Sequence, residues 1–199
     1  SSTLYCGTGS GPAHLFNRDV WDNLSGIVLA GETNPRVLAY DSFGRLERQD
    51  IPGAGIRYFA YDEFGNQVLQ AAYDGSTFMH ATERQFDAGD RLTSVIAHVG
   101  AAMPSEVERY EYDSYVTGQT TAPGALSDPK GLLTYVTKHD PNGFFTFSST
   151  YAWDARGNNI EKKVSMNGTD YVETYGYTLD DTVRTMTDPF GVMATYLSL

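Results

Sequence analysis

Tyr40–Leu46 reads YDSFGRL, a pattern typical of the turn at the tip of a β-hairpin. Asp41 stands at the first position of a four-residue turn, where its side chain can accept a backbone hydrogen bond. Gly44 stands at the fourth position, where the chain needs a positive φ that other residues resist. Tyr40 closes one extended run and Leu46 opens the next, so the stretch predicts two strands joined by a tight turn.

The same pattern returns along almost the whole chain, at spacings of roughly two short strands and two turns. Two further copies are clear: Tyr61-Asp62-Glu63-Phe64-Gly65 and Trp153-Asp154-Ala155-Arg156-Gly157. Two copies place Asp where Gly should stand: Phe86-Asp87-Ala88-Gly89-Asp90 and Tyr177-Thr178-Leu179-Asp180-Asp181. Asp tolerates the left-handed region better than most residues, so these copies predict the same turn.

Two looser copies begin at Trp21-Asp22 and Tyr112-Asp113 and place extra residues before Gly26 and Gly118. The residues expected to build the repeat turns are Tyr40, Asp41, Gly44, Tyr61, Asp62, Gly65, Phe86, Asp87, Trp153, Asp154 and Gly157. An isolated hairpin is marginally stable, so each copy should depend on pairing with its neighbours. An ordinary antiparallel sandwich with chance Tyr-Asp turns is the alternative explanation.

The recurring YDxxGRL pattern resembles that of the RHS or YD repeat proteins. This family includes the cores of bacterial polymorphic toxins, the cocoon subunits of insecticidal toxin complexes and the teneurins of animal cells. The resemblance covers roughly residues 16–192. It implies an all-β fold, in which successive β-hairpins form a curved, spiralling antiparallel sheet as part of a hollow shell. We therefore expect a lead-in segment over residues 1–15 and a repeat array over residues 16–199, with an irregular insertion at about 118–131, in a fragment of a longer shell.

The insertion contains a second motif of the family. Residues 123–132 fit the spacing PxxxxDPxGL, with Asp128, Pro129, Gly131 and Leu132 at its fixed positions. In polymorphic toxins similar to this chain, the motif marks an Asp-dependent self-cleavage that releases the C-terminal toxin. Here strands and turns resume after it, so a plain Asp-Pro turn leading into a strand at Leu132 is the favoured interpretation. Asp188–Val192 is a poorer echo of the same motif.

Composition restricts the kinds of partner. The net charge of −11 argues against nucleic acid or an anionic membrane surface, and no run is long and apolar enough to span a membrane. The single cysteine, Cys6, cannot form an internal disulfide. We expect no signal peptide in this segment, and the family context predicts a secreted or exported bacterial protein.

No enzymatic site is predicted. The four histidines (His14, His80, His98 and His139) lie far apart in sequence without metal-ligand spacing, and most motif carboxylates are explained by turn hydrogen bonds. We expect no catalysis, no cofactor and no metal.

Two functions remain. The first is structural: a shell segment whose partners are neighbouring repeats and an encapsulated toxin polypeptide. The second is a carbohydrate-binding or cell-surface interaction module, in which exposed aromatic rings and turn carboxylates bind glycans.

Overall fold

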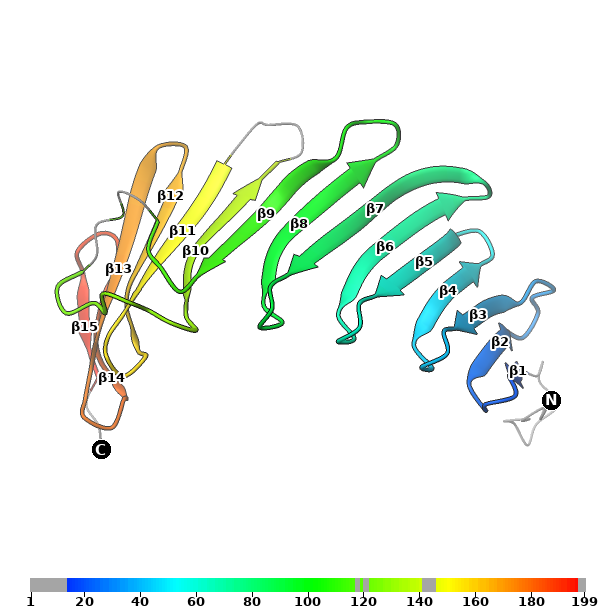
Figure 1. The fold of residues 1–199 in the computed structure, drawn as a ribbon, viewed down its shortest axis with the longest axis horizontal. Helices are drawn as coiled ribbons and strands as arrows, with labels where there is room; N and C mark the ends of the chain where they lie inside the picture. The colour runs from blue at the N-terminus through cyan, green and yellow to red at the C-terminus, as the bar shows by residue number, and fades with distance from the viewer. Residues whose placement is uncertain (1–13, 117–118, 120–121, 141–145, 197–199) are drawn as a thin grey trace. The chain divides into compact units, whose positions relative to one another are not determined.

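The computed structural model describes residues 14–116, 119, 122–140 and 146–196. In these residues every regular element is a strand, and 15 strands pair in sequence order, from β1 to β15, in one antiparallel sheet (Figure 1). The predicted all-β fold of successive hairpins is confirmed. The winding of such a sheet around a hollow chamber stays a prediction. No helix in the described ranges is long and apolar enough to cross a membrane.

The chain divides into two compact units. The first unit comprises the residues up to Arg84 together with Ala97–Pro104. Its strands are β1 (Leu15–Arg18), β2 (Leu24–Val28), β3 (Arg36–Tyr40), β4 (Leu46–Ile51), β5 (Gly55–Tyr61), β6 (Gln67–Asp74) and most of β7 (Thr77–Phe86). The expected lead-in lies outside the described residues up to residue 13, and β1 begins at Leu15.

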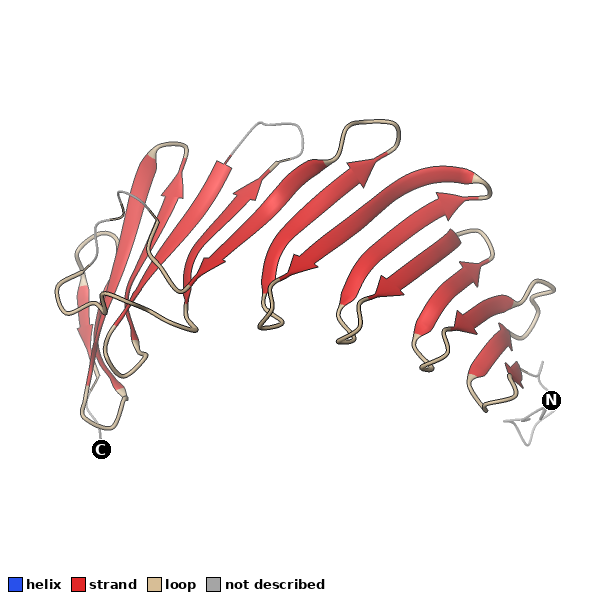
Figure 2. Ribbon diagram, in the orientation of Figure 1, coloured by secondary structure: helices blue, strands red, loops and turns tan. Residues whose placement is uncertain are grey.

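The second unit comprises Gln85–Ile96 and the residues from Ser105 onward. Its strands are most of β8 (Leu92–Val99), β9 (Ser105–Tyr112), β10 (Leu133–His139), β11 (Thr146–Trp153), β12 (Asn159–Met166), β13 (Thr169–Tyr177), β14 (Val183–Thr187) and β15 (Met193–Thr195). Between β9 and β10 the described residues hold no strand. The β9–β10 connection is therefore far longer than the five-residue turns that join the other repeat strands (Figure 2).

Each unit is a single layer of sheet, and few of its described apolar side chains are buried. Among the described residues, the buried hydrophobic ones are Ala71, Ala81, Val136 and Ala152. Ala71 and Ala81 face each other in the β6–β7 pair. Such small side chains cannot supply the burial that a layered domain obtains from Leu, Ile and Phe. Contacts between neighbouring hairpins must therefore carry most of the stability.

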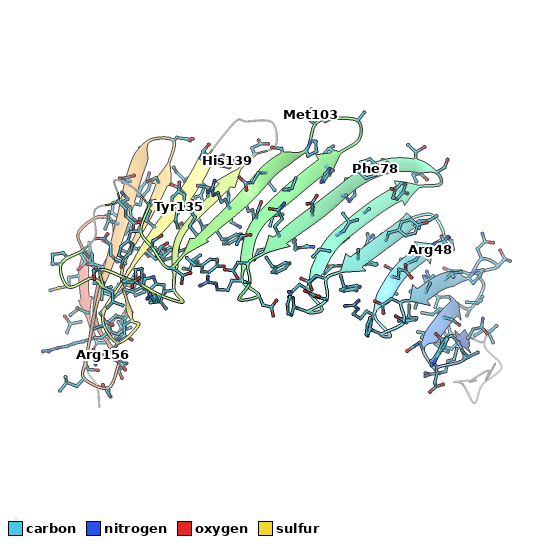
Figure 3. The ribbon with its side chains drawn as sticks, viewed as in Figure 1. Arg48, Phe78, Met103, Tyr135, His139 and Arg156 are labelled. Atoms are coloured by element: carbon cyan, nitrogen blue, oxygen red, sulfur yellow. The ribbon has the colours of Figure 1, made fainter. Side chains whose placement is uncertain are left out.

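Aromatic rings provide some of those contacts across strands. Tyr73 on β6 packs edge-on against Tyr58 on β5, with ring centroids 5.6 Å apart, and against Phe78 on β7 at 5.5 Å (Figure 3). Arg48 on β4 places its guanidinium 5.9 Å from the Tyr58 ring. Edge-to-face pairs of this kind stabilise beyond the area they bury, so they tie β5, β6 and β7 together, and the Arg48 contact adds β4.

Candidate functional site

The repeat turns are the feature that recurs through both units. In the copy at residues 41–45, the Gly44 amide donates to the Asp41 carbonyl at 3.0 Å and the Asp41 amide donates to the Arg45 carbonyl at 2.9 Å. The Asp41 Oδ1 atom accepts from the amides of Phe43 and Arg45, both at 2.9 Å. Gly44 has a φ of 78°, a conformation that L side chains resist. One carboxylate thus satisfies two turn amides while the glycine closes the loop.

Three other turns repeat this arrangement around Asp62, Asp87 and Asp154. Each carboxylate accepts from the amides two and four residues further on, at 2.8 to 3.0 Å. The left-handed position is held by Gly65 (φ 94°), Asp90 (φ 61°) and Gly157 (φ 83°). In the copy that starts at Thr178, the hydroxyl takes the carboxylate's place and Asp181 has a φ of 63°.

These hydrogen bonds stabilise the charged carboxylates. Burial alone would raise the pKa of Asp41, but hydrogen bonds from Arg45 and Phe43 outweigh it and hold the pKa below its ordinary value. The side-chain hydrogen bond from Arg91 lowers the pKa of Asp87. Carboxylates that stay ionised and fully engaged in a turn are poorly placed to act as general acids.

Before five of the repeat turns, a tyrosine or tryptophan side chain donates a hydrogen bond to the neighbouring hairpin. The Tyr40 hydroxyl donates to the Leu24 carbonyl at 2.9 Å, and the Tyr61 hydroxyl donates to the Leu46 carbonyl at 3.0 Å. The other members of the series are Tyr112 to Leu92 at 2.9 Å, Trp153 Nε1 to Leu133 at 2.7 Å, and Tyr177 to Asn159 at 2.7 Å. In every case the acceptor is the first residue of the strand that follows the preceding turn. We call this bond the inter-hairpin bond.

A shift in strand register accompanies the aromatic position. Tyr40 pairs with Leu46, whereas the preceding residue, Ala39, pairs with Arg48, so β4 carries one extra residue at this point. The same irregularity occurs beside Tyr61, Trp153 and Tyr177. A bulge of this kind reorients side chains next to a turn. It also occurs beside Arg18, which precedes the first turn, so it accompanies the repeat turn itself.

The last residue of a repeat turn also reaches the next turn along the sheet. Arg45 donates to Asp41 Oδ2 at 2.7 Å and to the Asp62 carbonyl at 3.1 Å, and its guanidinium lies 4.6 Å from the Tyr61 ring centroid. Arg91 binds Asp113 through two parallel hydrogen bonds at 2.9 and 2.7 Å. Asn158 bonds to Asp181 at 2.8 Å.

In the turn between β11 and β12, a second residue adds to the contact that Asn158 makes. Arg156, labelled in Figure 3, donates to the carbonyls of Thr178 and Leu179 at 3.0 Å each. A side chain of one turn therefore binds the next turn in three places, one in the first unit and two in the second.

The structure corrects the predicted position of the first turn. The sequence pattern predicts a turn that begins at Trp21-Asp22 and ends at Gly26, but the carboxylate that accepts from the turn amides belongs to Asp19. Asp22 itself holds the left-handed position, with a φ of 69°. Residues 19–23 are thus an undistorted repeat turn, and two acidic residues three apart made its register ambiguous in the sequence.

In the copy at Tyr112-Asp113, Gly131 completes the turn, whereas Gly118, which the sequence pattern predicts for this place, lies outside the described residues. The Asp113 amide donates to the Leu132 carbonyl at 3.1 Å, and the Gly131 amide donates to Asp113 Oδ1 at 2.6 Å. Gly131 has a φ of 80°. Leu133 then begins β10, as Leu46 begins β4. The insertion therefore lies within a repeat turn. The first residue of this turn, Asp113, still forms hydrogen bonds with its last residues, Gly131 and Leu132.

The PxxxxDPxGL motif, for which a plain Asp-Pro turn is the favoured interpretation, lies in the second half of this insertion. Pro129 is fully buried, and its carbonyl accepts from the Leu132 amide at 3.0 Å. The Asp128 carboxylate lies 3.4 Å from the Lys130 ammonium. The fully buried Thr134 donates to the Ser114 carbonyl at 2.6 Å and so fixes the start of the insertion. Gly131 and Leu132 close the turn that Asp113 begins, so the last residues of the motif hold the insertion against β9.

One repeat turn was missed. Residues 188–192 join β14 to β15, with the amides of Phe190 and Val192 donating to Asp188 Oδ1 at 2.9 and 2.8 Å. The sequence interpretation treated them as an echo of the cleavage motif. The DxxG spacing was the available signal, obscured by Thr187 in the place of the usual aromatic residue.

No cluster of three or more His, Cys, Asp or Glu side chains that could hold a metal ion occurs in the described part of the chain. A groove of about 380 Å³ lies between the turns at 19–23 and 41–45, lined by the rings of Trp21, Tyr40 and Phe43. A second hollow, of about 550 Å³, lies in the other unit beside Lys138 and Phe147, where Lys138 is paired with Glu108 at 2.8 Å.

No protein-family model matches the sequence, and no curated protein matches it either. The fold resembles part of a chain in the Photorhabdus luminescens Tc holotoxin pore, with a TM-score of 0.59, 14% identity, and coverage of 92% of this chain and 11% of that chain. The TcdB2-TccC3-Cdc42 complex gives a TM-score of 0.44 at 14% identity, over 97% of this chain and 12% of that chain. The TcdB2-TccC3 complex gives 0.44 at 15% identity, over 89% and 13%. At such identities the likeness shows the fold alone, and the chain spans a small part of each of these proteins.

Proposed function

We propose that this chain is a wall segment of an RHS/YD-type container that encloses a toxin or other passenger polypeptide, and that it performs no catalysis itself. The observation that carries the proposal is the inter-hairpin bond. An aromatic donor before the turn binds the preceding hairpin in five places, Tyr61 to Leu46 among them. The repeat residues thus join each hairpin to the one before it, and an extended wall of hairpins needs such links between neighbours.

The use of the turn carboxylates supports a structural role. Asp41, Asp62 and Asp154 each accept two backbone amides and one side-chain donor. A carboxylate with three donors has little capacity left for a substrate. The likeness of fold to part of a chain in a Tc holotoxin pore supports a container in an exported bacterial toxin.

The test uses the protein encoded by the complete reading frame around this segment. We expect a passenger segment to resist a protease concentration that digests the same segment expressed alone. In the triple variant Gly44→Val, Gly65→Val and Gly157→Val, the strained turns should weaken the wall, and protection should fall. Equal digestion of the passenger inside the complete protein and alone would refute the proposal.

A carbohydrate-binding module is the alternative. The groove beside Trp21 and Phe43 offers stacking surfaces, but its carboxylates are already engaged within the turns. Sugar hydroxyls need polar partners when they leave water, so we rank this function second. A glycan array probed with the chain tests it directly.

A further inference from the structure

Three large aromatic side chains project from successive repeat turns of the first unit. Trp21, Phe43 and Phe64 occupy the same turn position, two residues after the turn aspartate, and they are 80%, 82% and 69% exposed. We call them the aromatic row. The turn chemistry does not require a ring at this position, because Gly89 and Arg156 stand there in other copies. Exposed rings placed in register across three neighbouring turns therefore call for an explanation outside the fold.

The row has a regular spacing. The three turns join β1 to β2, β3 to β4 and β5 to β6, and they lie at the same end of these strands (Figure 2). Neighbouring strands lie about 4.8 Å apart, so successive turns of this kind recur at about 10 Å. A ligand that meets all three rings must present an apolar surface with a similar repeat.

The groove between the first two turns shows which chemistry fits. Its walls are the rings of Trp21, Tyr40 and Phe43. Its polar groups are largely engaged, because Asp19 and Asp41 each accept two amides and a side-chain donor. The Tyr40 hydroxyl donates to Leu24. The site therefore favours a ligand that stacks on rings and keeps its own polar groups in water.

Charge adds a second criterion. The three turns hold five carboxylates, those of Asp19, Asp22, Asp41, Asp62 and Glu63, against two guanidiniums, that of Arg45 and that of Arg18, which precedes the first turn and pairs with Asp22. A ligand with basic residues next to its apolar repeat would be attracted to these three turns.

We propose that the aromatic row is a docking surface for a proline-rich peptide segment that carries Lys or Arg. A polyproline II helix has three residues per turn and rises about 9 Å per turn, which matches the spacing of the row. Every third residue would then meet a ring of the next repeat turn. Its backbone carbonyls need no partner in the site, since this helix keeps them solvated, and aromatic-lined grooves are the usual acceptors of such segments.

The probe is a synthetic peptide of nine prolines with one arginine at each end, titrated into the chain by calorimetry. We expect saturable binding and a change in the fluorescence of Trp21. The variants Phe43→Ala and Phe64→Ala should each weaken binding about fivefold, the loss of one ring contact of about 1 kcal/mol. Both side chains project into solvent, so circular dichroism should confirm an unchanged fold.

Phe190→Ala is the matched control. Phe190 holds the same turn position and is 83% exposed, but it lies in the second unit, and Asp180 occupies this position in the preceding turn. Its removal should leave the affinity unchanged. A peptide in which Gly-Ser repeats replace the prolines should not bind. The proposal is overturned if the proline peptide fails to bind, if Phe190→Ala weakens it as much as Phe43→Ala, or if a β-linked glucan hexamer binds the row in its place.

Discussion

The hydroxyl of Tyr61 donates a hydrogen bond to the carbonyl of Leu46 at 3.0 Å, across the junction between two hairpins. Tyr61 is the last residue of β5, directly before the turn to β6, and Leu46 is the first residue of β4, directly after the turn from β3. The bond therefore joins the turn region of one hairpin to that of the hairpin before it. The Arg45 guanidinium covers the same ring at 4.6 Å and reaches the Asp62 carbonyl. The aromatic residue, the turn aspartate and the arginine of YDxxGR are thus parts of a single connection between repeats.

Removal of this hydroxyl should destabilise the chain. In Tyr61→Phe the ring remains, but the Leu46 carbonyl loses its donor, which should cost about 1 kcal/mol in the free energy of unfolding. Urea denaturation followed by circular dichroism measures the loss. Tyr58→Phe is the control, because the Tyr58 ring packs on Tyr73 and its hydroxyl makes no inter-hairpin bond. Equal midpoints for Tyr61→Phe and the parent chain would contradict the role assigned to the hydroxyl.

The loss of stability on replacing a turn glycine should depend on how well the new residue tolerates a positive φ. Gly65 has a φ of 94° and no atom close to where a Cβ would stand, so strain and not crowding decides the cost. Gly65→Val should destabilise by more than the roughly 1 kcal/mol lost at ordinary glycine sites. Gly65→Asn should cost clearly less, since Asn tolerates the left-handed region. Thermal melts of Gly44→Val and Gly157→Val should follow the Val result, and a Val variant that melts with the parent would contradict the assignment.

Acid should weaken the link between Arg91 and Asp113. The side-chain hydrogen bond from Arg91 lowers the pKa of Asp113 to about 2. A carboxyl whose folded pKa is depressed contributes stability above its unfolded pKa and loses it as pH falls through the folded value. Asp113→Asn should therefore lower the urea midpoint at pH 7, and the difference from the parent should shrink as pH falls from about 4 to about 2. A difference that does not depend on pH would show that charge plays no part.

The bond after Leu132 should stay intact. The Leu132 carbonyl accepts from the Asp113 amide, and the fully buried Pro129 anchors the motif inside a closed turn. We expect intact-mass spectrometry to show a single species after storage at neutral pH, in both the parent and Asp128→Asn. A split at residue 132 that Asp128→Asn abolishes would instead identify a self-processing protein.

The sequence by itself determined the hairpins and most of their turns. The hydrogen bonds that the amides of Phe64 and Asn66 donate to Asp62 span at most four residues, and the positive φ of Gly65 is a local property. Interactions of such short range are encoded by adjacent residues, so their repetition predicted the strand order of the fold.

Only the tertiary structure decided how the repeats are joined. The partners in the inter-hairpin bonds lie 15 to 20 residues apart, and strand pairing brings them together. Strand pairing also selected Asp19 over Asp22 as the first turn carboxylate, and it brought Gly131 to Asp113 across the insertion. Local sequence offered both Asp19 and Asp22, because either could adopt the conformation. The register of the flanking strands fixed the choice, and register depends on contacts that lie outside any single turn.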